Sequence, residues 1–327
     1  MKPTGTRCLL AALLVCLCVA DATAGTLKSR RFEGGEYVPV SDVAHYYRLG
    51  RNSSSDRDSA AYRDLRVEAD RREIILDGVQ HWLSAPVFSA QGKLWVSALD
   101  VLKTLDPVLR RGRTSKRISV RTIVLDPGHG GHDRGALGCA GGVEKTLVLD
   151  LARRLQQQLE PRGFTVWLTR TTDRFVPLEA RTEFAAQKKA DMLISIHLNA
   201  NGTAHGVETF CLTPANAVST ATAFRGWHRS GQSAPPERGN RHDEQNIWLA
   251  HCIQKSLLRS TGAADRGVRR ARFAVLRDAP CPAVLLEAGF LTHAAEERRL
   301  LTPDYRQRLA KAVAEGILSY KDAVEKN

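Results

Sequence analysis

The distribution of apolar and polar residues changes along the chain near residue 121. From there on, short apolar runs that fit β-strands alternate with longer segments of helical periodicity. The strand-like runs are residues 122–125, 164–168, 192–196, 207–212, 273–276 and 283–286, and the helical segments are residues 145–159, 178–188, 244–258 and 305–324. This alternation predicts an α/β fold, with a mostly parallel six-stranded sheet that carries helices on both faces.

Residues 26–109 follow a different pattern and predict a small α+β domain ahead of the larger one. Two similar strand–helix units at residues 36–44 and 92–102 flank a meander with strands at residues 65–69 and 73–76. Ser41 and Ser97 are the expected N-caps, because a serine hydroxyl can accept a free backbone N–H at a helix start. The pattern loosely resembles the stalk-type domain at the N-terminus of copper amine oxidases, and it contains no group of catalytic side chains.

The remaining boundaries follow from composition. A basic segment at residues 110–120 is expected to link the small domain to a catalytic domain at residues 121–324. A polar insertion at about residues 214–243 interrupts that domain, and loops of this length are uncommon unless they are functional or disordered. A lid or substrate-binding flap is one interpretation, plain disorder is another, and an autoinhibitory segment with a short helix at residues 217–224 is the third.

The N-terminus has the features of a secretory signal peptide spanning residues 1–24. Lys2 and Arg7 precede an apolar run at residues 8–20, and small residues follow at the spacing of a cleavage site. A membrane anchor is one alternative, but the run is shorter than the roughly 20 apolar residues that a span needs. A lipoprotein is the other, but Val15 before Cys16 and Leu17 before Cys18 are poor residues for lipobox cleavage. We therefore expect a protein exported to the periplasm or cell wall, without stable membrane insertion.

Charge and cysteines are consistent with export. The formal net charge is +13, and it becomes +12 when Lys2, Arg7 and Asp21 leave with the signal. Such a charge suits an anionic polymer such as the cell wall, or it serves only solubility, and export argues against nucleic acid. The remaining thiols can form two disulfides in three pairings or stay buried and free: Cys139, Cys211, Cys252 and Cys281.

Four polar side chains lie at the ends of the predicted elements. His129 follows the first strand in a glycine-rich turn, Glu144 opens the first helix, and His197 and Glu287 each end a later strand. Residues at the carboxyl ends of parallel strands converge on one edge of the sheet. Each residue alone has an ordinary structural explanation, but their joint placement favours a site.

Two histidines and a glutamate with an open fourth position form the ligand pattern of catalytic zinc. A metal there would activate water, and Glu287 would take up the proton, which leads to hydrolysis of an amide or ester. His132, three residues after His129, is the alternative ligand. Asp133 is expected to orient His129, and Asn199 to brace His197 or to bind peptide.

The glycines around His129 do not form a nucleotide site. The pattern GxGxxG fails because the sixth position counted from Gly128 is Asp133, and GxxxxGK[ST] does not occur. The motif HExxH is also missing, so this is not a helix-borne zincin site.

Four segments in order resemble the zinc-dependent N-acetylmuramoyl-L-alanine amidases, which cut peptidoglycan between N-acetylmuramic acid and L-alanine (EC 3.5.1.28). They are residues 124–133, 142–145, 195–200 and 285–292, with further matches at Arg181 and residues 265–268 and 273–277. The resemblance covers about residues 121–320. It implies Zn²⁺ ligands at His129, Glu144 and His197 and a catalytic carboxylate at Glu287, while the usual asparagine of the last motif is replaced by His293.

A secreted zinc amidase acting on peptidoglycan is therefore the leading interpretation. An inactive amidase fold that serves as a wall-binding regulatory module is the first alternative, and a zinc peptidase that cuts stem peptides is the second. Nothing in the sequence identifies a regulatory activator, the preferred stem peptide or the oligomeric state.

Overall fold

The computed structural model describes residues 27–32, 35–51, 58–113, 117–220 and 234–326. The expected signal peptide at residues 1–24 and the middle of the expected insertion lie outside these ranges. Within the expected short helix at 217–224, the described residues 217–220 are not helical. No helix in the described part of the chain is long and apolar enough to cross a membrane.

The larger region is built on six strands, and the predicted α/β class is confirmed. They are β9 (Thr122–Pro127), β10 (Thr165–Leu168), β11 (Met192–Asn199), β12 (Val207–Leu212), β13 (Asp265–Ala271) and β14 (Ala283–Phe290). Their order is β10-β9-β11-β14-β12-β13. The first four are parallel, whereas β12 runs antiparallel to β14 and parallel to β13.

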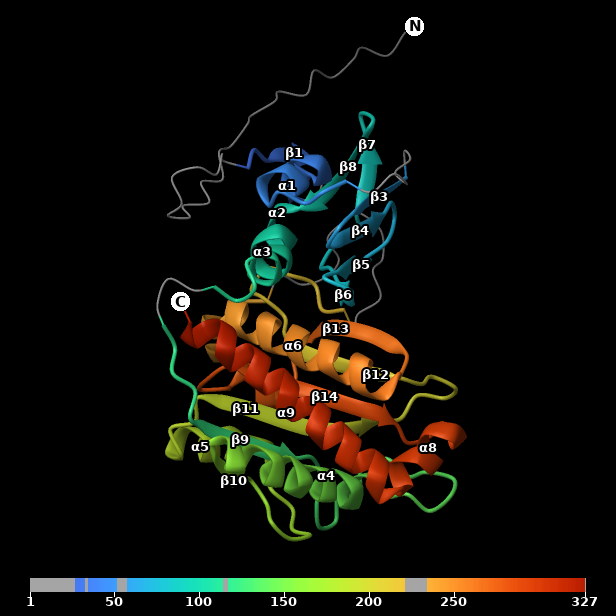
Figure 1. Ribbon diagram of the computed structural model, residues 1–327, viewed down its shortest axis with the longest axis vertical. Helices are drawn as coiled ribbons and strands as arrows, with labels where there is room; N and C mark the ends of the chain where they lie inside the picture. Colours follow the sequence, from blue (N-terminus) through green and yellow to red (C-terminus); the bar gives the residue numbers. More distant parts are fainter. Residues whose placement is uncertain (1–26, 33–34, 52–57, 114–116, 221–233, 327) are drawn as a thin grey trace, which may run out of the picture.

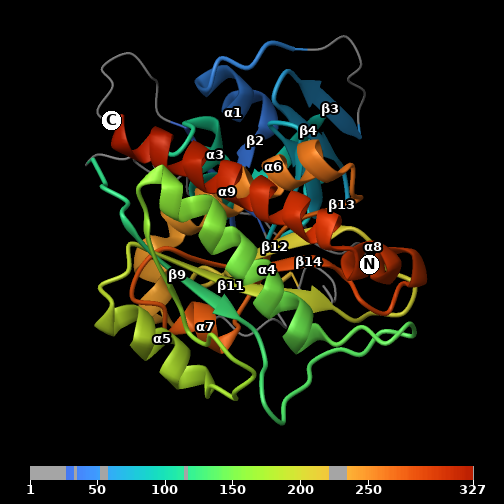
Figure 2. The same ribbon diagram turned by 60° about the horizontal axis from the view of Figure 1, so that its bottom comes forward.

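Helices cover both faces of this sheet, as the periodicity predicts (Figures 1 and 2). One layer contains α4 (Glu144–Leu159), α6 (Asp243–Thr261) and α9 (Pro303–Glu325), and the opposite face carries α5 (Leu178–Gln187) and α7 (Ala274–Arg277). Side chains alternate between the two cores along a strand. Ile123 and Leu125 join the core under the larger helical layer, while Val124 joins the core that contains Leu276.

One predicted strand is wrong. Residues 274–276 lie in the one-turn helix α7, Phe273 is its N-cap, and the sixth strand is β13 instead. A run of four apolar residues fits either element, so periodicity alone does not separate them. The sequence of β13 is rich in arginine and has no apolar run, so it does not look like a buried strand. Its arginines are tolerated there because acceptors such as Glu208 and the Leu212 carbonyl bind their guanidinium groups.

The N-terminal region forms two sheet segments and short helices. Strands β1 (Arg30–Phe32), β2 (Gly35–Pro39), β8 (Lys93–Ser97) and β7 (Phe88–Ala90) form a separate antiparallel sheet in that order. The helical elements here are α1 (Val40–Tyr46), α2 (Ala98–Asp100), η1 (Val101–Leu105) and α3 (Asp106–Leu109). Ser41 lies inside α1, whose N-cap is the extended Pro39, so that cap prediction is wrong. Ser97 is the N-cap of α2, but its side chain makes no capping hydrogen bond.

Four further N-terminal strands extend the large sheet. They are β3 (Ser59–Tyr62), β4 (Leu65–Glu68), β5 (Glu73–Leu76) and β6 (Val79–Trp82), and β6 pairs in parallel with β13. The result is one continuous ten-stranded sheet, which spans both regions in Figure 1. Two further hydrogen bonds reinforce this pairing: the Gln80 backbone N–H donates to Asp265 Oδ2 at 2.7 Å, and Trp82 Nε1 donates to the Arg266 carbonyl at 3.0 Å.

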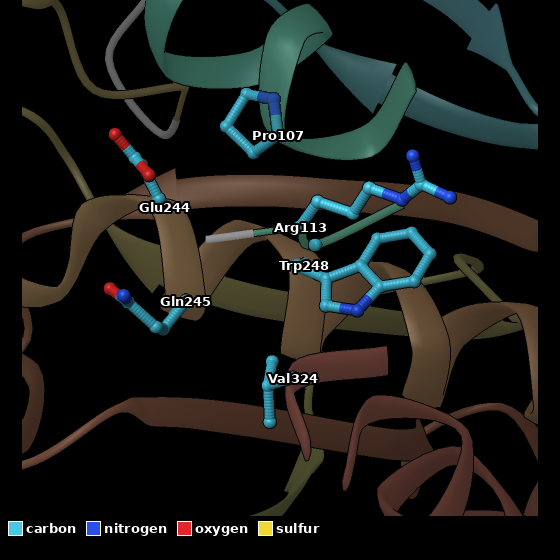
Figure 3. Close-up of a pocket in the computed structure, with 7 residues that line it drawn as sticks. Pro107, Arg113, Glu244, Gln245, Trp248 and Val324 are labelled. Carbon is cyan, nitrogen blue, oxygen red and sulfur yellow. The ribbon is translucent and has the colours of Figure 1, made fainter. Parts of the chain in front are cut away.

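The two regions also meet beside the helical layer. Pro107 of α3, Trp248 of α6 and Val324 of α9 line a small pocket, together with residues of the segment that follows α3 (Figure 3). None of the predicted site residues lines this pocket. The described thiols are all free, with Cys139 exposed and Cys211, Cys252 and Cys281 buried. Three of the four cysteines are therefore buried free thiols, as one of the two interpretations predicts, and none of the four is in a disulfide.

A buried pair of histidines crosses the same interface. His81 Nε2 of β6 lies 3.0 Å from His251 Nδ1 of α6, and His251 Nε2 lies 3.2 Å from Asp77 Oδ2. A carboxylate only accepts hydrogen bonds, so His251 donates through Nε2 and accepts from His81 through Nδ1. His81 Nδ1 then carries a bare lone pair, and it has no hydrogen-bond partner among the described residues.

This arrangement predicts that the free energy of unfolding falls on acidification. Burial lowers the pKa of both His81 and His251, so the folded protein binds protons at these residues only at a lower pH than the unfolded chain does. The unfolded chain binds protons at these residues below about pH 6.5, which costs the folded state up to about 1.4 kcal/mol per pH unit for each proton. Urea denaturation at pH 7.5, 6.5 and 5.5 measures the slope.

His81→Leu isolates the contribution of the pair, and His45→Gln is a matched control because His45 is exposed on α1. We expect a shallower pH dependence in His81→Leu and an unchanged one in His45→Gln. Equal slopes in His81→Leu and the wild type would contradict the prediction, since every other titrating group is shared.

Candidate metal centre and active site

His129 lies in a strained turn directly after β9. Its φ is 60°, in the left-handed region that a residue with a side chain adopts only when its surroundings enforce it. Two buried arginines enforce it here. Arg181 Nη2 donates to the His129 carbonyl at 3.1 Å, and Arg170 Nη2 donates to the Gly128 carbonyl at 2.7 Å. The turn therefore presents His129 in a fixed position.

Two glycines of the turn allow the functional side chains to approach one another. A Cβ atom on Gly128 would lie 2.2 Å from Cε1 of His197. A Cβ atom on Gly135, which has φ +64°, would lie 2.5 Å from Glu144 Oε2 and 2.7 Å from His129 Cδ2. The glycine-rich sequence is thus required by the packing of the site itself.

The three predicted ligands come together at the edge of the sheet. His129 Nε2 and His197 Nδ1 each lie 3.0 Å from Glu144 Oε1. One potential ligand atom from each residue falls within 4.8 Å of the others, a spacing that suits a single metal ion. His132 is not part of this group and instead packs against Phe175, with ring centroids 4.2 Å apart.

Neighbouring groups orient these side chains. Asp133 Oδ2 lies 2.8 Å from His129 Nδ1, which leaves Nε2 facing Glu144. Metal-binding histidines commonly have such a carboxylate on the other ring nitrogen. One predicted role of Asn199 is to brace His197, but in the described part of the chain its Nδ2 donates to Glu208 Oε1 at 2.7 Å instead.

Glu144 is a buried carboxylate held in its charged form. Burial alone would raise its pKa, but hydrogen bonds from His129, His197 and the Ala136 amide hold that pKa well below its ordinary value. The Leu198 amide donates to Oε1 at 3.0 Å and the Ala136 amide to Oε2 at 2.7 Å. Two imidazoles and a buried carboxylate that face one point form a donor set that fits Zn²⁺.

Glu287 adjoins this group through the pairing of the strands. On β14 it lies opposite His197 of β11 on one side and opposite Glu208 of β12 on the other. Burial raises its pKa well above the ordinary value, and the charges of Glu144 and Glu208 raise it further. Its Oε2 atom is buried and has no hydrogen-bond partner among the described residues. This carboxylate is therefore placed to exchange a proton with a bound reactant.

The structure also reveals supporting residues that were not predicted. Helix α8 (Ala294–Leu301) follows β14, and its Glu297 accepts from the Ala140 and Gly142 amides in the loop before Glu144. A buried glutamate in a charged helix has no distinct sequence pattern, so it was missed. His293 is the N-cap of α8, where Nδ1 accepts from the Glu296 amide at 3.4 Å. Its capping role explains how histidine replaces the usual asparagine there.

An α/β sheet with a His–Glu–His group and an adjacent buried glutamate is the arrangement of a metal-dependent hydrolase. Comparison with known proteins agrees. The family model described as N-acetylmuramoyl-L-alanine amidase matches residues 123–319. N-acetylmuramoyl-L-alanine amidase AmiA of Escherichia coli (strain K12) is 30% identical over 290 residues, which cover 80% of this chain and 95% of that protein.

Two further relatives support the match. N-acetylmuramoyl-L-alanine amidase AmiC of Neisseria meningitidis serogroup B is 33% identical over 239 residues, which cover 68% of this chain and 57% of that protein. The solved structure of N-acetylmuramoyl-L-alanine amidase AmiC2 of Nostoc punctiforme aligns with a TM-score of 0.51 at 30% identity, covering 62% of this chain and 97% of that one. The chain belongs to the N-acetylmuramoyl-L-alanine amidase family and is an enzyme.

Proposed function

We propose that this chain hydrolyses the amide bond between N-acetylmuramic acid and L-alanine in peptidoglycan, with Zn²⁺ held by His129, Glu144 and His197. One observation carries the proposal. The three ligand atoms lie within 4.8 Å of one another, and the buried Glu287 Oε2, on the strand next to His197, has no hydrogen-bond partner among the described residues. Family membership supplies the substrate class, and it supports the metal requirement.

The zinc ion, when bound, would supply a Lewis acid that polarises the amide carbonyl and makes water acidic enough to attack at neutral pH. The protein supplies the rest. Glu144 contributes the negative charge of the ligand set, and the Leu198 and Ala136 amides fix both of its oxygens. Asp133 beside Nδ1 favours the His129 tautomer that carries its proton there, so that Nε2 could bind the metal.

Glu287 is the proton carrier in this proposal. Its carboxylate takes a proton from the attacking water and then delivers it to the nitrogen of the departing L-alanine. A single group performs both steps well when its pKa lies nearer neutrality than that of an ordinary glutamate. Burial and the neighbouring carboxylates raise the pKa of Glu287 in that direction, and a bound cation would oppose them.

The proposed place of action is outside the cytoplasm, in the periplasm or at the cell wall. The pattern of residues 1–24 favours export, and the formal net charge of +12 that remains after removal of Lys2, Arg7 and Asp21 favours approach to an anionic polymer. We propose no regulatory activator, since the described residues point to no particular partner.

Product analysis tests this function. Purified peptidoglycan incubated with the full chain and Zn²⁺ should release stem peptides with a new L-alanine N-terminus and leave a free lactyl carboxylate on the glycan. Mass spectrometry of the soluble and insoluble products identifies the bond that is cut. Cleavage within the stem peptide would establish a peptidase instead, and a metal-loaded protein that binds peptidoglycan without cutting it would establish a wall-binding module.

A further inference from the structure

The catalytic carboxylate has a second glutamate as its direct neighbour. Glu208 on β12 lies opposite Glu287 on β14 and is only 2% exposed. A buried carboxylate without compensation is strongly unfavourable, so its partners determine where it lies. Its Oε1 accepts from Asn199 of β11, and its Oε2 accepts from Arg269 at 2.9 Å and from Arg266 at 3.2 Å.

These contacts connect every strand around Glu287. Asn199 and His197 belong to the same strand, β11, while the two arginines belong to β13 on the far side of β12. One carboxylate thus ties β11, β12 and β13 together beside the catalytic glutamate. The position of Glu287 depends on this link because β14 lies between β11 and β12.

A residue of the N-terminal region, Trp82, contacts the two arginines that bind Glu208. The Arg269 guanidinium lies over the ring of Trp82 on β6, with Cζ 4.6 Å from the ring centroid. The same tryptophan donates from Nε1 to the backbone carbonyl of Arg266 at 3.0 Å. Trp82 therefore contacts both arginines, Arg269 through its ring face and the Arg266 backbone through its Nε1–H.

We propose that Trp82 is a positioning residue of the active site. It fixes Arg269 and the Arg266 backbone, these two arginines hold Glu208, and Glu208 with its strand neighbours sets the place of Glu287. The N-terminal region therefore takes part in catalysis by completing the sheet behind the catalytic carboxylate. This inference rests on the proposed amidase function.

The test measures kcat and KM of Trp82→Leu on a soluble muramoyl-peptide fragment. We expect kcat to fall about 10-fold, because misplacing a catalytic group by 1 Å costs up to about 100-fold. KM should stay within about 2-fold and zinc content should be unchanged, because Trp82 contacts Arg266 and Arg269 and lies outside the His129–Glu144–His197 ligand group. Trp82→Phe keeps a ring face for Arg269, and we expect it to recover most of the lost kcat.

Trp95→Leu is the matched control. Trp95 is buried in the separate β1-β2-β8-β7 sheet, where its Nε1 donates to the Ala90 carbonyl. It should retain wild-type kcat although it also removes a tryptophan from the N-terminal region. Circular dichroism and thermal unfolding confirm that the compared variants are folded.

The outcomes separate the two proposals. Wild-type kcat in a folded Trp82→Leu, or an equal loss in Trp95→Leu, overturns the positioning role and leaves the amidase function standing. A metal-loaded wild type that leaves the fragment uncut overturns both proposals.

Discussion

Replacing Glu287 with glutamine is expected to lower kcat for the amide bond by at least about 100-fold, within the 10²- to 10⁴-fold range typical of general acid–base groups. Glutamine has nearly the same shape but cannot carry the proton from water to the leaving nitrogen. Zinc content should remain at the wild-type level, because the ligand group consists of His129, Glu144 and His197. The substitution should therefore impair proton transfer and leave zinc binding unchanged.

Release of dye from labelled peptidoglycan measures this effect, and metal analysis of the same samples checks the site. Glu179→Gln on α5 is a matched control because Glu179 is exposed. A Glu287→Gln enzyme with more than half of the wild-type rate would exclude Glu287 as the proton carrier.

Replacing His197 with alanine is expected to remove the metal and, with it, the activity. Residues that only contact a metal ligand typically contribute about 10- to 100-fold to metal affinity, so loss of a ligand should exceed about 100-fold. Asp133→Asn should fall within that smaller range, because Asp133 is not a ligand and reaches the ligand group through His129 Nδ1. Titration with a competing chelator gives the affinities.

His132→Gln is the informative control for this experiment. The alternative ligand assignment exchanges His129 and His132, but the His132 ring packs on Phe175, outside the ligand group. We expect wild-type zinc affinity in His132→Gln. A large loss there, or full zinc retention in His197→Ala, would contradict the proposed ligand set.

Much of the site was predictable because its residues follow regular elements. His129, His197 and Glu287 follow or end apolar strands, and Glu144 opens an amphipathic helix, so topology alone brings them to one edge. The glycines at 128 and 135 stand out in the sequence as well, although the reason for them is visible only where a Cβ would meet His197 or Glu144.

The errors have a common physical origin. An apolar run at 273–276 is equally compatible with a strand and with the helical turn α7, so only its packing assigns it. Strand β13 has arginines where an apolar run would be expected. Buried acceptors and an aromatic ring contact the guanidinium groups of Arg266, Arg269 and Arg270, which allows these residues to lie in a strand. Charged residues normally indicate exposure, and local composition does not show that a partner elsewhere in the chain neutralises them.

The periodicity of residues 122–324 predicted the α/β class, and two histidines and two glutamates at the ends of the predicted elements predicted a metal site at the edge of the sheet, because both inferences depend on local geometry. The tertiary structure alone decided three further features: β6 pairs with β13, Glu297 secures the loop before Glu144, and Glu208 lies between Glu287 and two arginines. Each of these contacts joins residues that are distant in the chain. They form because buried backbone groups and charges require partners, and only the folded chain brings those partners within reach.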